Sequence, residues 1–223
     1  MTEKIVIIDY GSGNLRSALK SVETVIAAEG LDAVALVSAR ADDIAAADRI
    51  ILPGQGAFGD CMAGLSSIDG MIGALNDSVI RRGVPFFGIC VGMQLLATRG
   101  HEHGVHEGLN WIAGDVVKMV PSDPSLKIPH MGWNDVTLTD AGKTHPALRR
   151  VMENSGESLP HFYFVHSFVF DCKDSVSILG RAEYGGVVPA IIGRDNIIGT
   201  QFHPEKSQQA GLDLIAGFLS WKP

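Results

Sequence analysis

Apolar residues in the first half of the chain alternate between short continuous runs and positions spaced as on a helix. The run at residues 5–8, Ile-Val-Ile-Ile, predicts a buried strand. Apolar side chains then recur at helical spacing up to a helix stop at Gly30: Leu15, Leu19, Val22 and Ile26. Further strands are predicted over residues 33–37, 50–52 and 84–87, and a helix over 71–82. Strands that alternate with helices predict a mostly parallel sheet with helices on both faces.

The second half of the chain shows strand-like runs separated by tight turns. These runs cover residues 116–119, 135–138, 162–170, 176–184, 187–192 and 197–202, with a hairpin signal at 193–196. The apolar positions between 212 and 219 predict a closing helix, and the polar stretch 98–108 predicts a surface loop. We therefore expect a single α/β domain over residues 1–223, with antiparallel strands added in its C-terminal half.

Composition excludes several classes of protein. The 223 residues carry a formal net charge of −7, and the absence of a basic run argues against a nucleic-acid partner. Apolar stretches are too short for a membrane span or a secretory signal, so a cytoplasmic protein is expected. Three cysteines without CxxC spacing suggest neither disulfides nor a metal site, and Cys61 and Cys172 are expected to be structural thiols. No phosphate-binding or dinucleotide motif indicates a cofactor.

The candidate nucleophile is Cys90, which follows the predicted strand at 84–87 and lies between Gly88 and Gly92. Glycines on both sides allow a sharp turn from strand to helix, which lifts the thiol out of the sheet and places it near a helix N-terminus. The next backbone N–H, that of Val91, would then point at the reaction centre. A small buried core cysteine explains this segment equally well.

A second candidate segment is His203-Pro204-Glu205, which follows the strand predicted at 197–202. Active sites of open α/β sheets lie at the carboxyl ends of strands, where His203 is expected. Glu205 is close enough in sequence for its carboxylate to orient the imidazole, which is the logic of a catalytic triad. Alone, the segment is more simply a solvated turn, but together with the cysteine turn it favours catalysis.

These segments resemble the class I, triad-type glutamine amidotransferases. Other segments resemble, more narrowly, the glutaminase subunits of imidazole glycerol phosphate synthases: residues 9–15 (DYGSGNL), 53–56 (PGQG), 129–134 (PHMGWN), 162–168 (FYFVHSF) and 201–207 (QFHPEKS). The resemblance implies hydrolysis of glutamine by Cys90, His203 and Glu205. A glutaminase subunit of anthranilate or aminodeoxychorismate synthase is the alternative enzyme, and a non-catalytic binding module is the alternative of another class.

The resemblance also implies a glutamine-binding pocket. The oxyanion would be held by the N–H of Val91 and by the segment Gly54, Gln55 and Gly56, where Gln55 replaces an expected small apolar residue. Without the resemblance, an ordinary turn is the better explanation of that segment. Gln94 and the backbone of His166, Ser167 and Phe168 would bind the head of free glutamine.

Finally, the resemblance implies a separate (β/α)8-barrel cyclase subunit that receives the ammonia and makes imidazole glycerol phosphate in histidine biosynthesis. The candidate docking residues are Asn14, His130, Met131, Trp133 and Lys206. Trp133 is the strongest of these, because Trp is enriched among interface anchors, although a core position is nearly as well supported.

Overall fold

A computed structural model describes residues 2–155 and 161–223. Its largest sheet has eight strands in the order β2-β1-β3-β4-β14-β13-β12-β9. The parallel strands are β1 (Glu3–Ile8), β2 (Ala33–Ser38), β3 (Arg49–Gly54), β4 (Phe86–Cys90) and β14 (Ile197–Thr200), and the antiparallel ones are β13 (Val187–Arg194), β12 (Ile178–Glu183) and β9 (Thr137–Leu138). The expected α/β fold with an antiparallel extension is confirmed.

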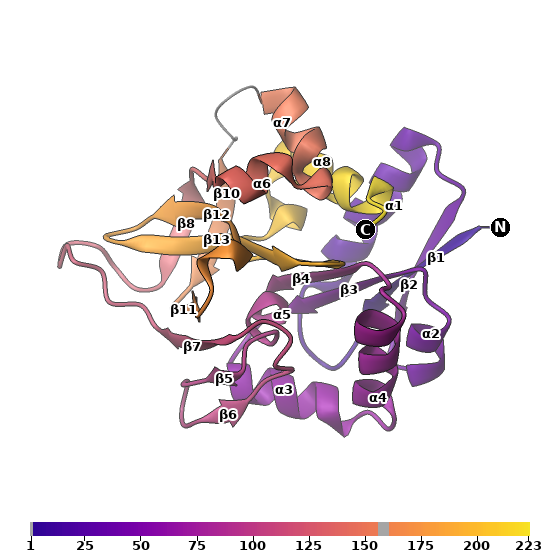
Figure 1. Cartoon of the computed structure of the whole chain (residues 1–223), viewed down its shortest axis with the longest axis horizontal. Helices are drawn as coiled ribbons and strands as arrows, with labels where there is room; N and C mark the ends of the chain where they lie inside the picture. Colours follow the sequence, from indigo (N-terminus) through magenta and orange to yellow (C-terminus); the bar gives the residue numbers. More distant parts are fainter. Residues whose placement is uncertain (1, 156–160) are drawn as a thin grey trace.

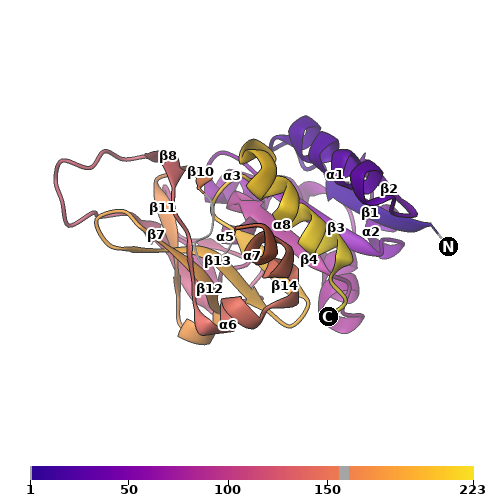
Figure 2. The ribbon, with the colours of Figure 1, turned by 90° about the horizontal axis from the view of Figure 1, so that it is seen from above.

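Helices cover both faces of this sheet (Figure 1). One face carries α1 (Leu15–Glu29) and α8 (Gln208–Ser220), which lie side by side (Figure 2), together with α7 (Arg149–Ser155). The other face carries α2 (Ala41–Ala45), α3 (Phe58–Ser67) and α4 (Met71–Leu75). Within the described parts of the chain, no helix combines the length and the apolar character that crossing a bilayer requires.

Two smaller sheets extend from the main one. The pair β10 (Phe162–His166) and β8 (His130–Asn134) is antiparallel, and a four-stranded sheet has the order β11-β7-β5-β6. Its strands are β11 (Phe168–Cys172), β7 (Gly114–Lys118), β5 (Arg99–Gly100) and β6 (His106–Glu107). Short helical segments complete the described elements: η1 (Asn76–Arg81), α5 (Val91–Gln94), α6 (Asp140–Thr144), η2 (Pro146–Leu148), η3 (Ser175–Ser177) and η4 (Pro204–Lys206).

Local sequence explains the confirmed elements. The four residues Ile5–Ile8 of β1 are all buried because both faces of a central parallel strand are covered. Helix α1 ends at Gly30, whose φ of 62° is left-handed and whose N–H donates to the Ile26 carbonyl, as in a glycine-terminated helix.

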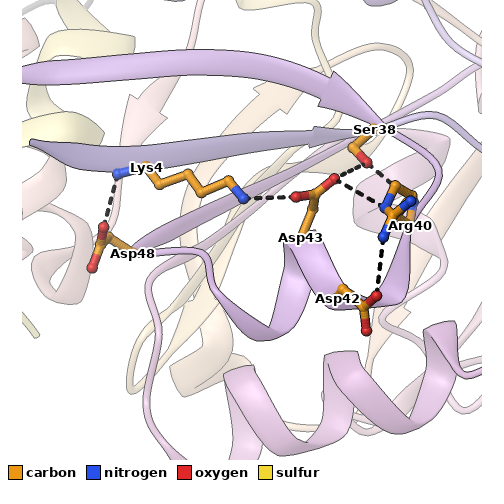
Figure 3. A network of polar contacts seen from close by, with 6 residues as sticks. All are labelled: Lys4, Ser38, Arg40, Asp42, Asp43 and Asp48. Carbon is orange, nitrogen blue, oxygen red and sulfur yellow. Dashed lines mark hydrogen bonds and ion pairs between the residues drawn. The ribbon is translucent and has the colours of Figure 1, made fainter.

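Polar contacts tie the edge of the main sheet to α2 (Figure 3). Lys4 Nζ lies 2.7 Å from Asp43 Oδ1, and Ser38 Oγ donates to Asp43 Oδ2 at 2.6 Å. These bonds lower the pKa of the Asp43 carboxyl. The ionised Asp43 carboxylate therefore stabilises the folded chain at pH values above the ordinary pKa of the group, and this stability is lost as the pH falls through the lowered pKa.

Several element boundaries differ from the sequence-based expectation. Residues 162–170 form two strands rather than one: β10 pairs with β8 and β11 pairs with β7, so the chain changes sheets at Ser167. The predicted helix 71–82 continues after Leu75 as a π-helical segment, Asn76–Arg81. The expected loop 98–108 contains β5 and β6, and only Thr137–Leu138 of the strand predicted at 135–138 is observed. Residues 175–177 are helical, and β8 was not expected.

Candidate active site

The candidate nucleophile Cys90 is the last residue of β4 and is 4% exposed. Its backbone has φ 55° and ψ −113°, a conformation that costs an L-residue about 1–3 kcal/mol. A Cβ on Gly92 would lie 1.8 Å from the Leu52 carbonyl oxygen, and one on Gly88 would lie 2.7 Å from the Gly92 carbonyl oxygen. The two flanking glycines are therefore required sterically for this turn.

The helix after the turn is a single turn long. Helix α5 spans only Val91–Gln94, so the helix macrodipole near Cys90 is that of a single turn. The electropositive groups near Cys90 include local backbone N–H groups, that of Val91 first.

Parallel pairing brings the other candidate residues to the same edge of the sheet. In the register of β3 and β4, Gly54 lies opposite Cys90, and β14 runs parallel to β4 on its other side. His203 follows β14 by three residues, and its backbone N–H donates to the Tyr163 carbonyl at 2.9 Å. His203 therefore lies at the carboxyl end of a parallel strand, as predicted.

The imidazole of His203 lies between the sulfur and a buried carboxylate. His203 Nδ1 is 2.8 Å from Glu205 Oε1, and the two side chains are 4% and 3% exposed. Because Nδ1 faces the carboxylate, Nε2 is the nitrogen free to face the Cys90 sulfur. The other carboxylate oxygen, Glu205 Oε2, is buried and has no hydrogen-bond partner within the described residues.

Two opposing effects set the pKa of His203. Burial lowers it, but hydrogen bonds with Cys90 and Glu205 and the negative charges of both raise it further, to about 9. The imidazolium form is therefore favoured near neutral pH, so His203 can act as a proton donor.

Most of the predicted catalytic and substrate-binding residues line one cavity of about 280 Å³ next to the sulfur: Gln55, Gly56, Cys90, Val91, Gln94, His166, Ser167, Phe168 and His203. Pockets for drug-sized ligands measure roughly 300–1,000 Å³, so this cavity fits a ligand the size of an amino acid. Gly54 and Glu205 do not line it. Glu102, which no sequence pattern singled out, also lines the cavity and accepts a hydrogen bond from the backbone N–H of Phe58 at 2.9 Å.

The segment expected to complete the oxyanion hole is held from outside the cavity. The N–H of Gln55 donates to Ser12 Oγ at 3.2 Å. The Gln55 carbonyl accepts from Ser12 Oγ and, at 3.4 Å, from Cys61 Sγ. Gly56 follows with φ 105°. In this conformation the Gln55 N–H is therefore engaged by Ser12.

A directed chain of hydrogen bonds supports the cavity wall. His166 Nδ1 faces the Phe168 carbonyl at 2.9 Å, and a carbonyl can only accept, so this nitrogen carries the proton. His166 Nε2 then accepts from His130 Nδ1 at 2.9 Å, and His130 Nε2 accepts from Asn134 Nδ2 at 3.2 Å. Burial lowers the pKa of both imidazoles to about 4, which keeps them neutral.

These contacts correct one expectation about the docking residues. His130 is 2% exposed and its ring stacks on Phe164 and Tyr184, so it cannot belong to an exposed surface. In contrast, Met131 and Trp133 on the same strand are 61% and 48% exposed. The strand presents alternate residues to opposite sides, and only the odd-numbered pair faces outward.

The outward side of β8 continues across its partner strand. Trp133 packs edge-on against Tyr163, with ring centroids 6.0 Å apart, and Lys206 Nζ lies 5.8 Å from the centroid of the same ring. Lys206 is exposed and also lines the mouth of the cavity, and Asn14 is partly exposed before α1, which contacts η4. Met131, Trp133, Tyr163 and Lys206 are called the β8 face below.

Other candidate chemistry is sparse. Cys61 is buried, Cys172 is partly buried, and both are free thiols. Burial, and next the charges of Asp171 and Asp174, raise the pKa of Cys172 to about 12. Among the residues that the structure describes, no group of three His, Cys, Asp or Glu side chains is arranged to hold a metal ion.

Comparison with known proteins identifies the class. Residues 6–219 match the family "Glutamine amidotransferase class-I". A GMP synthase component from Thermoplasma acidophilum has a similar structure, with a TM-score of 0.62 at 18% identity over 98% of this chain and 93% of that one. A glutamine amidotransferase from Thermotoga maritima gives a TM-score of 0.60 at 14% identity, over 94% of this chain and 79% of that one. The chain belongs to the class I glutamine amidotransferases.

Sequence relatives define a narrower group. The imidazole glycerol phosphate synthase subunit HisH of Rhodopseudomonas palustris is 53% identical over 98% of this chain and 99% of its own length. The subunit HisH of Brucella suis is 52% identical over 99% of this chain and 100% of its own length. Within its class, the chain therefore belongs to the family of imidazole glycerol phosphate synthase subunit HisH.

Proposed function

We propose that this chain hydrolyses glutamine to glutamate and ammonia and passes the ammonia to a cyclase subunit, which forms imidazole glycerol phosphate in histidine biosynthesis. The observation that carries the proposal is the placement of a buried imidazole between Cys90 and the carboxylate of Glu205, beside a cavity of amino-acid size. Membership of the HisH family supports the pathway, and a cytoplasmic location is inferred from that biosynthetic role.

The first half-reaction forms a thioester. The sulfur of Cys90 attacks the side-chain amide carbon of glutamine, and the carbonyl oxygen becomes an oxyanion. The N–H of Val91 stabilises that oxyanion. The imidazolium of His203 then gives its Nε2 proton to the amide nitrogen, the C–N bond breaks, and ammonia leaves.

The second half-reaction restores the enzyme. Neutral His203 takes a proton from water, whose oxygen attacks the thioester carbon. The C–S bond breaks, the electron pair returns to sulfur, and glutamate leaves. Glu205 keeps the imidazole in one orientation throughout and stabilises its charged form.

The oxyanion hole requires a second donor. We assign this donor to the peptide backbone at Gln55 and Gly56, consistent with their position at the cavity. Because the Gln55 N–H is bonded to Ser12 Oγ in the free chain, this N–H must leave Ser12 before it can donate to a ligand. Basal activity of the free chain is therefore expected to be low, and partner binding is expected to raise it.

The head of glutamine is matched by polar groups in the same cavity. Both N–H groups of the Gln94 amide have acceptors, Phe168 O at 3.2 Å and Gln201 Oε1 at 3.0 Å, which leaves Gln94 Oε1 for a ligand. We assign the α-ammonium group to Gln94 Oε1 and the carboxylate of Glu102, and the α-carboxylate to backbone N–H groups around Ser167. Opposite charge and hydrogen-bond direction both support this orientation.

The cyclase is proposed to be a (β/α)8 barrel that docks on the β8 face. Exposed Trp and Met side chains beside a Lys at the mouth of the cavity provide an apolar anchor with a charged rim. A partner placed there lies next to the cavity, so ammonia can pass between the two proteins without entering bulk water.

The test is ammonia release from glutamine by the isolated chain, repeated with the cyclase partner and its nucleotide ligand. We expect slow release by the free chain and faster release by the liganded complex. Absence of release under both conditions would favour a binding module. Stimulation only by an anthranilate-type synthase partner would favour the alternative enzyme.

A further inference from the structure

Gln201 is a buried polar side chain that accepts a hydrogen bond from Gln94 and also touches the sulfur of Cys90. It lies between β14 and His203, and its exposed fraction is 0%. Its Nε2 is 3.8 Å from Cys90 Sγ, within the range of a hydrogen bond to sulfur, and its backbone N–H donates to the Ala190 carbonyl at 2.9 Å. A fully buried amide aimed at a reactive atom calls for a chemical explanation.

The contacts of Gln94 determine which atom of the Gln201 amide faces the sulfur. One amide atom of Gln94 lies 3.2 Å from the Phe168 carbonyl, which can only accept, so that atom is the nitrogen Nε2. The same nitrogen lies 3.0 Å from the Gln201 amide, so the atom of Gln201 that meets it is the acceptor Oε1. Gln201 Nε2, the donor, must then face Cys90.

We propose that Gln201 is a positioning residue for the nucleophile: its amide N–H holds the Cys90 sulfur toward the cavity and stabilises negative charge on it. This inference rests on the proposed glutaminase chemistry and adds a residue to it. Charge on sulfur occurs twice in that reaction, before attack on the amide carbon and again when the C–S bond of the thioester breaks. A fixed N–H donor favours both states and is itself unchanged.

The position of Gln201 also explains why an amide is used there. His203 approaches the sulfur as a proton carrier, whereas an amide N–H does not titrate near neutral pH. The sulfur therefore keeps one donor after His203 has given its proton to ammonia. If Gln201 served packing alone, an apolar side chain of similar length would replace it without effect on the reactivity of Cys90.

The first experiment compares Gln201→Met with Thr200→Val. Methionine keeps the length of the side chain and removes the donor, whereas Thr200→Val removes a neighbouring buried hydrogen bond, from Thr200 Oγ1 to the Phe202 carbonyl at 3.1 Å, and leaves the sulfur untouched. The purified full chain reacts with iodoacetamide at pH 7, and peptide mass mapping measures the rate at which Cys90 is alkylated. We expect Gln201→Met to slow alkylation about tenfold, as for a lost charge-assisted hydrogen bond, and Thr200→Val to leave it unchanged.

A second variant, Gln201→Glu, is used in case Gln201→Met does not fold. The glutamate keeps the buried hydrogen bond from Gln94 Nε2, which methionine removes. Its second carboxyl oxygen faces the sulfur. Ionisation of this carboxyl opposes the thiolate, so the alkylation rate relative to wild type should fall as the pH rises. A residue with only a packing role would not produce this pH profile. In the complex with the cyclase, kcat for glutamine should fall in both variants. KM should stay unchanged in Gln201→Glu, whereas it should rise in Gln201→Met, which also removes the acceptor for Gln94 Nε2.

Equal alkylation rates in the wild type, the control and the folded Gln201 variants would overturn the inference. Slower alkylation in the Gln201 variants supports it even if no partner elicits glutamine hydrolysis. Absence of glutamine hydrolysis with every partner would count against the proposed function alone, because alkylation requires neither glutamine nor a partner.

Discussion

Replacement of Glu205 by Gln tests the role of the buried carboxylate next to His203. The substitution preserves size, so its effect follows from charge and hydrogen-bond direction. A glutamine that presents its NH2 to His203 Nδ1 forces that nitrogen to accept and selects the wrong tautomer. A glutamine turned the other way places the NH2 where Glu205 Oε2 now lies buried without a partner among the described residues. In that orientation the NH2 has no acceptor among the described residues, so the amide gains no hydrogen bond that would offset the lost charge.

The expected loss of kcat in Glu205→Gln follows from the pKa of His203. Burial lowers this pKa, yet Cys90 and Glu205 together raise it from 6.5 to about 9. A net rise of this size is a preference for imidazolium of roughly 3 kcal/mol. Glu205 is one of the two contributors to this preference, so losing its charge together with the correct tautomer should lower kcat by roughly 10- to 100-fold. Loss of a triad carboxylate beside serine costs ~10⁴-fold, and sulfur, the better nucleophile, depends less on its base.

The assay is steady-state glutaminase kinetics of the complex with the cyclase, together with thermal unfolding of the chain. We expect kcat to fall and KM to stay near the wild-type value. In the wild type, the raised pKa of His203 means that imidazolium stabilises the fold fully below pH 6.5, and this stability is lost as the pH rises through about 9. In Glu205→Gln the loss should occur at lower pH. A higher KM with unchanged kcat would instead place Glu205 in substrate binding or docking.

Three further outcomes are expected. Cys90→Ala and Cys90→Ser should abolish glutamine-dependent synthesis by the complex and spare ammonia-dependent synthesis; loss of both rates in an assembled complex would contradict the assignment. A diazo-ketone analogue of glutamine should label Cys90 and spare Cys61, which is 1% exposed, and Cys172, whose pKa is raised to about 12, as peptide mapping can check. Gly92→Ala should destabilise by about 3 kcal/mol in denaturant titrations, because its Cβ would lie 1.8 Å from a carbonyl oxygen, whereas Gly73→Ala, with open space around it, should not. Equal stability of the two alanine variants would mean that the turn at Cys90 is adaptable.

Features that depend on local sequence could be predicted. The strand at residues 5–8 and the helix that ends at Gly30 follow from the spacing of apolar residues and from one left-handed glycine. The turn at Cys90 follows from two glycines at fixed offsets. The proximity of Glu205 to His203 follows from the short Pro204 turn between them.

Features that depend on partners distant in sequence were missed. The alternating pattern of residues 162–170 fits one strand, and only pairing with two different sheets reveals the break at Ser167. His130 is polar and next to exposed residues, and its burial depends on the rings of Phe164 and Tyr184. Gln201 occupies an ordinary strand-end position, and nothing nearby in sequence indicates that its amide meets a sulfur 111 residues away.

The exposed side chains of Met131 and Trp133 also bear on the balance of subunit production in the cell. They lie on one strand of a two-stranded sheet, so the free chain presents an apolar face next to a strand edge. Chain made in excess of its partner keeps that face in contact with water and with other copies of itself. The yield of free chain should therefore follow the supply of the partner, and co-expression of the two proteins should recover more of it than expression alone.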